Sequence, residues 1–144
     1  MILHDAAMTH FGQWWRRAVR SGHAYAEHWW IHRSGAFPAW RRQVMSILFW
    51  GGLLPTIMIA LAVADIGGWV SRPYAMLPTM LYLLQWGRIA TRKILSGASV
   101  SHAARYAVLM LVGKFAEMRG MLKFLANKTG RRQSRLIEHK NLAR

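Results

Sequence analysis

The sequence predicts an all-α membrane protein made of an amphipathic interfacial helix, a two-helix transmembrane hairpin and a C-terminal interfacial helix. First, 53% of the 144 residues are hydrophobic, although Lys and Arg number 20 and Asp and Glu only 5, a formal net charge of +15. Second, an uncharged apolar segment fills residues 44–64. Third, tryptophans and arginines are concentrated near the N-terminus. This combination favours a membrane protein with its charges at the membrane edges over a basic soluble protein.

The first predicted element is an amphipathic helix over residues 8–30, within an interfacial segment of residues 1–43. On a helical wheel of about 100° per residue, the apolar and polar side chains separate onto two halves. The apolar half includes Trp14, Trp15, Trp29 and Trp30, and the polar half holds Gln13, Arg16, Arg17, Arg20, His23, Glu27 and His28. This separation suits the membrane surface, where we expect the four tryptophans to lie. Nucleic-acid stacking would need aromatics and arginines on one face, so nucleic acid is the least favoured partner.

The predicted transmembrane hairpin comes next. Residues 44–64 are long enough to cross a hydrocarbon core of about 30 Å, and 144 residues are too few to bury such a segment in a soluble core. Residues 65–68 are predicted to form an outward turn. Residues 69–87 are then expected to return across the bilayer, with a re-entrant segment as the alternative. Trp69, Tyr74 and Trp86 lie near the ends of this second helix, as an aromatic belt requires.

The positive charges predict the orientation of this hairpin. Six arginines precede the first span, only Arg72 lies near the turn, and thirteen Lys or Arg follow Gly87. The positive-inside rule therefore places both termini in the cytoplasm. The first residues, MILHDAAMTH, lack the basic and apolar regions of a signal peptide.

The C-terminal third is predicted to lie on the membrane rather than cross it. Residues 88–127 are interpreted as a basic linker broken by Gly97, followed by an amphipathic helix from about Ser101 to Asn127. Arg105, Arg119 and Lys123 share one side of this helix. Its apolar run, residues 106–112, is too short to span, so we expect it at the interface or on a partner domain, with a third span as the alternative. Residues 128–144 form a basic tail that is solvated or binds anionic lipid.

No catalytic or metal-binding residue is predicted within this chain. It contains no cysteine, which removes thiolate nucleophiles and thiolate metal ligands. His28 and His32 have a spacing that metals use on a helix, but no third ligand is identifiable. His23 and Glu27 are expected to form a local polar pair.

Two parts of the chain are similar to a known family. The segment HDAAMTHFGQWWRRAVRSGHAYAE resembles the region that follows the catalytic domain in bacterial family-2 glycosyltransferases of the membrane-bound, polysaccharide-making kind. The later LVGKFAEMRGMLKFL and RLIEHK resemble the C-terminal end of such enzymes. The resemblance covers about His4 to Lys140 and implies a location in the bacterial inner membrane.

The resemblance also implies a role for the polar face of the first helix. These enzymes transfer a sugar from a nucleotide sugar, usually with a divalent metal, to a lipid-linked or polysaccharide acceptor. Processive members carry a Gln-x-x-Arg-Trp motif on the interfacial helix. Gln13, Trp14 and Arg16 match Gln, an intervening residue and Arg, while Arg17 replaces the final Trp. By this resemblance Gln13, Trp14, Arg16 and Arg17 are substrate-binding residues.

The chain departs from the family at its catalytic half. No Asp-x-Asp for metal and diphosphate, no paired carboxylates for a base and no glycine-rich phosphate loop occur in it. We therefore expect the membrane-anchoring, acceptor-side module of such an enzyme, inactive alone, with a GT-A catalytic domain supplied in cis or in trans. The alternative is a small basic membrane adaptor that binds anionic lipid or a partner protein.

Overall fold

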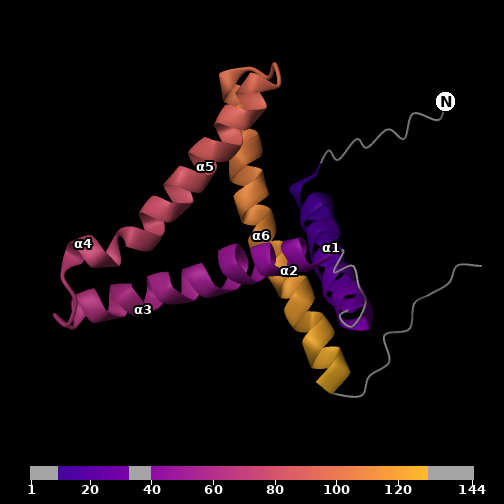
Figure 1. Cartoon of the computed structure of the whole chain (residues 1–144), viewed down its shortest axis with the longest axis horizontal. Helices are drawn as coiled ribbons and strands as arrows, with labels where there is room; N and C mark the ends of the chain where they lie inside the picture. The colour runs from indigo at the N-terminus through magenta and orange to yellow at the C-terminus, as the bar shows by residue number, and fades with distance from the viewer. Residues whose placement is uncertain (1–9, 33–39, 130–144) are drawn as a thin grey trace, which may run out of the picture.

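The computed structural model describes residues 10–32 and 40–129, and every regular element in these ranges is a helix (Figure 1). The elements are α1 (Phe11–His32), α2 (Arg41–Ile47), the π-helix η1 (Leu48–Leu53), α3 (Leu54–Ile66), α4 (Arg72–Ala75), α5 (Leu77–Leu95) and α6 (Val100–Thr129). The predicted all-α class is confirmed for these residues. Most of the predicted tail, residues 128–144, lies outside the described ranges.

α2, η1 and α3 form one continuous helix, Arg41–Ile66, which is long and apolar enough to cross a membrane. It contains the first predicted span. The π-helical turns end just before Pro55, whose ring crowds the carbonyl four residues earlier and whose nitrogen carries no proton. A locally wider helix relieves this crowding. The Thr56 hydroxyl donates a hydrogen bond of 2.8 Å to the Gly52 carbonyl, which gives that carbonyl a partner near the proline.

The helix expected over residues 69–87 has different bounds. Residues 69–71 are not helical, and the helical residues divide into α4 and α5, with α5 continuing to Leu95. The reason is that Pro73 and Pro78 each occupy the first turn of a helix, the position where a missing N–H costs least. Residues 88–95, expected as linker, are the basic end of α5.

A two-helix hairpin is not shown by this arrangement. Within residues 10–32 and 40–129, Arg41–Ile66 is the one helix that is both long and apolar enough to span. Figure 1 shows α3 and α5 meeting at α4 and diverging from there, with α5 running obliquely back to the start of α6. The second crossing therefore stays a prediction.

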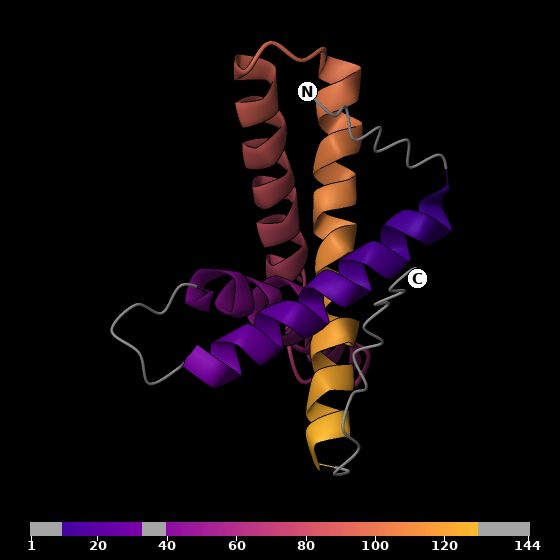
Figure 2. The same ribbon diagram turned by 90° about the vertical axis from the view of Figure 1, so that its right-hand side faces the viewer.

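The other helices assemble on α6, whose bounds agree with the helix predicted over residues 101–127. It contacts α1, α2, η1 and α5. Figure 2 shows α5 and α6 side by side, joined by a turn in which Gly97 has a φ of 91°. The Trp86 indole donates a hydrogen bond of 3.3 Å to the Ala104 carbonyl across this pair.

α1 crosses α6 at two glycines, as Figure 2 shows for the two ribbons. A Cβ added at Gly22 would overlap the Glu117 carbonyl, and one added at Gly120 would overlap the Val19 carbonyl. The backbones therefore touch without intervening side chains. The apolar half of α1, expected to meet lipid, is the half that packs on α6. The membrane contact of its four tryptophans stays a prediction.

A small apolar core forms where α1, α2 and α6 meet. Its buried members are Ala26, Val44, Ile47 and Met121, with Tyr25, Trp29, Met118 and Phe124 packed against them. This core attaches the first turns of the continuous helix to the α1–α6 pair. It fixes the polar face of α1 beside the start of the candidate span.

Gly120→Ala is expected to lower the free energy of unfolding by about 1–3 kcal/mol, because the new methyl group must push α1 away from α6. Gly12→Ala is the matched control, since a Cβ at Gly12 meets no atom within 4 Å. The control is expected to leave the free energy unchanged or to raise it by up to about 1 kcal/mol. Denaturant unfolding in detergent, followed by tryptophan fluorescence, measures both. Equal effects of the two substitutions would contradict the close crossing.

Candidate anion site between α1 and α6

Two helices contribute cations to one cavity beside the glycine crossing. Arg16 and Arg20 lie one turn apart on α1, and Arg119 and Lys123 lie one turn apart on α6. Together with Trp15 and Val19 these residues line a cavity of about 660 Å³, called here the basic groove. The groove exists because the crossing at Gly22 and Gly120 brings the two backbones together.

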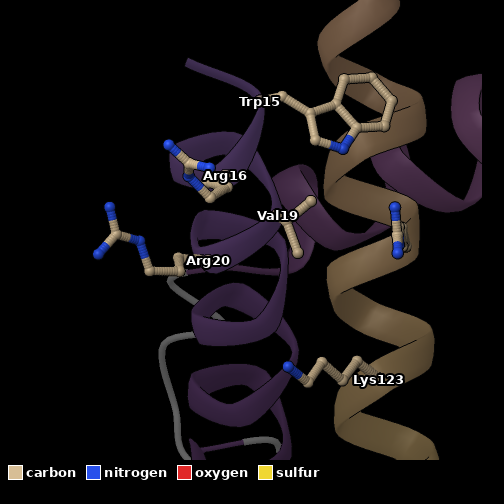
Figure 3. A pocket seen from close by; sticks show the side chains of 6 residues that line it. Trp15, Arg16, Val19, Arg20 and Lys123 are labelled. Carbon is tan, nitrogen blue, oxygen red and sulfur yellow. The ribbon is translucent and has the colours of Figure 1, made fainter. Parts of the chain in front are cut away.

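Figure 3 shows how the lining residues lie. Trp15 and Val19 reach from α1 toward α6, and Lys123 reaches from α6 toward α1. Arg16 and Arg20 follow the outer side of α1 in this view. The cations border a wide, open groove and do not converge on one point. Such an arrangement suits an extended or mobile anion better than a single tightly chelated one.

No carboxylate of the described residues neutralises these cations. Each described carboxylate has another nitrogen-bearing side chain as its neighbour: Glu117 lies 2.8 Å from the Lys114 ammonium, Asp65 lies 3.7 Å from the Arg72 guanidinium, and Glu27 lies 3.8 Å from the His23 imidazole. The basic groove therefore concentrates like charges, which repel one another and attract anions.

The structure brings together three of the four predicted substrate-binding residues. Gln13, Arg16 and Arg17 line, with Arg20, a second depression on the polar face of α1. Trp14 lies elsewhere, because its ring packs near Gly113 of α6. It lines a pocket that also contains Arg17, Ser21 and Glu117.

Sequence reasoning identified the α1 cations but not their neighbours on α6. The sequence places Arg119 and Lys123 on the same side of a predicted helix, which indicates a basic face. It does not indicate which helix lies beside that face. The structure shows that this helix is α1, through the close crossing at Gly22 and Gly120.

The histidine predictions have separate outcomes. The His23–Glu27 contact confirms the expected local pair. His28 and His32 stack with ring centroids 6.3 Å apart, and His28 also lies beside Trp40. In the part of the chain that the structure describes, no three potential ligands gather around a possible metal position.

Comparison with protein-family models, with curated proteins and with solved structures gave no match. The glycosyltransferase resemblance therefore stays a prediction that rests on the segments quoted above.

Arg119→Gln is expected to raise the melting temperature in zwitterionic detergent at low salt, because it removes one of four like charges from the basic groove. The gain corresponds to a few tenths of a kcal/mol and should vanish at high salt, where the repulsion is screened. Arg92→Gln on α5 removes the same charge outside the groove and should change little. A gain at Arg119 that persists at high salt would show that charge repulsion is not its cause.

Proposed function

We propose that this chain is the membrane-anchoring, acceptor-side module of a glycosyltransferase that moves a sugar from a nucleotide sugar to a lipid-linked or polysaccharide acceptor. The observation that carries the proposal is the polar face of α1. Gln13, Arg16, Arg17 and Arg20 border a depression to which the other described helices contribute no lining residue. A catalytic domain can therefore reach this face while α6 supports the opposite one.

The arrangement of the helices supports a membrane-surface location for this face. In Figure 1, α1 and α6 run across the direction of α3. With α2–α3 crossing a bilayer, α1 and α6 lie along its surface at the α2 end, and α1 is on the outer side of α6. The arginine charges favour the cytoplasmic surface of a bacterial inner membrane, with both termini on that side and α5 returning from the outward turn.

The chemistry of the polar face fits one half of a transfer site. A departing nucleoside diphosphate gains negative charge, which guanidinium groups stabilise through paired hydrogen bonds. A base and a metal site must come from elsewhere. Among residues 10–32 and 40–129, Glu27, Asp65 and Glu117 are separately paired, and none shares a site with another carboxylate. A GT-A domain, in cis or in trans, would hold the nucleotide sugar and the divalent metal.

The purified chain alone is expected to transfer no sugar when given nucleotide sugars and a divalent metal, because the carboxylates of residues 10–32 and 40–129 are each paired elsewhere and none is placed as a catalytic base. Product formation is measured by mass spectrometry.

The DNA just upstream of the Met1 codon provides the complementary test. A continuation encoding Asp-x-Asp and an acidic base supports the proposal, and robust turnover by the chain alone overturns it. Lipid binding by a chain from which no glycosyltransferase partner is recovered would instead favour the basic membrane adaptor.

The proposed orientation predicts opposite accessibility for two introduced thiols. The chain has no cysteine, so every label reports an introduced residue. In intact cells, Ser71→Cys beside the outward turn should react with a membrane-impermeant maleimide, whereas Thr129→Cys at the end of α6 should react only after permeabilisation. Labelling of both residues in intact cells would contradict two crossings with cytoplasmic termini.

A further inference from the structure

The basic groove carries charge that the proposed transfer site does not require. Two of its cations, Arg119 and Lys123, belong to α6 and do not line the Gln13 depression. The carboxylates of the described ranges are paired with side chains outside the groove. We propose that the basic groove binds the phosphate headgroups of anionic phospholipids from the surrounding bilayer.

The position of the groove matches the depth of lipid headgroups. Met121 and Ala26 are buried against Val44 and Ile47, which lie in the first turns of the Arg41–Ile66 helix. Arg119 and Lys123 lie in the same turn of α6 as Met121 but on a different side of the helix, because residues two apart in a helix point in nearly opposite directions. The groove therefore lies along α6 near the end of the candidate span that precedes its apolar stretch, where headgroup phosphates surround a spanning helix.

The lining of the groove suits an amphipathic ligand. Trp15 and Val19 lie among the cations, and the Trp15 ring is partly buried. A soluble phosphate would contact only the cations. A phospholipid can place its phosphate between the arginines and its glycerol and first acyl carbons against the indole and Val19, as aromatic side chains do at membrane interfaces.

The spacing of the cations favours a headgroup layer over one compact anion. Each helix supplies two cations at i and i+4. Figure 3 shows Arg16 and Arg20 on the side of α1 away from α6, whereas Lys123 reaches toward α1. Several phosphates can therefore be contacted at once, and exchange of lipids is not hindered. Basic pockets between membrane-associated helices bind anionic headgroups in this way.

This inference goes beyond sugar transfer. It requires the Arg41–Ile66 helix to be membrane-embedded, but neither a nucleotide sugar nor a catalytic domain. Lipid binding is measured without either of them, so its outcome is independent of the test for transfer.

The test is lipid binding to the full chain in neutral detergent, followed by native mass spectrometry. Phosphatidylglycerol is the probe, and phosphatidylcholine is the zwitterionic reference. Arg119→Gln combined with Lys123→Gln removes the α6 half of the groove. The matched control is Arg88→Gln combined with Arg92→Gln, which removes two exposed cations at the same spacing from α5. Arg119→Lys combined with Lys123→Arg keeps the charge.

The α6 double substitution is expected to weaken phosphatidylglycerol binding about tenfold or more, while the α5 control changes it less than about twofold. The charge-conserving variant should bind like the parent chain, and added salt should weaken binding. If the α6 double substitution prevents folding, Arg16→Gln combined with Arg20→Gln tests the same groove from α1.

Three outcomes would overturn the inference. One is an equal loss from the α5 and α6 double substitutions, which would mean attraction by net charge alone. Another is phosphatidylcholine binding as tightly as phosphatidylglycerol. The third is displacement of phosphatidylglycerol by inorganic pyrophosphate at equal concentration, which would assign the groove to a soluble anion.

Discussion

The backbone contact between α1 and α6 is the constraint on which the rest of the described structure depends. Gly22 and Gly120 allow the helices to approach until the carbonyls of Glu117 and Val19 occupy the space where side chains would be. This closeness places Arg16 and Arg20 beside Arg119 and Lys123. It also leaves the polar face of α1 uncovered. One packing interaction therefore sets both the basic groove and the proposed transfer face.

A second close approach connects the candidate span to the same support. A Cβ at Gly51 would overlap the Lys114 carbonyl of α6. Beside it, the Tyr82 hydroxyl of α5 donates a hydrogen bond to the Trp50 carbonyl. Both contacts fall within the π-helical turns that precede Pro55. The π-helical part of the long helix is thus also contacted directly by α5 and α6.

The long, uniform segments could be predicted from the sequence, because helical periodicity and apolar length are local properties. Residues 101–127 and 44–64 illustrate this, since each lies inside a helix with nearly the expected bounds. Apolar length alone does not predict the breaks at residues 69–71 and 76, which accompany Pro73 and Pro78 in the first turns of α4 and α5. The partner of α1 could not be predicted, because Gly22 and Gly120 are far apart in sequence and either glycine alone indicates no contact. The cations of α1 were therefore identified, while the groove that they share with α6 was not.

The same crossing has a consequence for the order of biosynthesis. α1 is made before α6, so the ribosome adds about one hundred residues before the apolar half of α1 meets its partner. At typical elongation rates this interval is about 5–20 s. If α1 meets the bilayer as proposed, the membrane surface can shelter its tryptophans during that time, because an interface accommodates an amphipathic helix that has no protein partner. The arrival of α6 then provides the glycine-mediated backbone contacts and completes the basic groove.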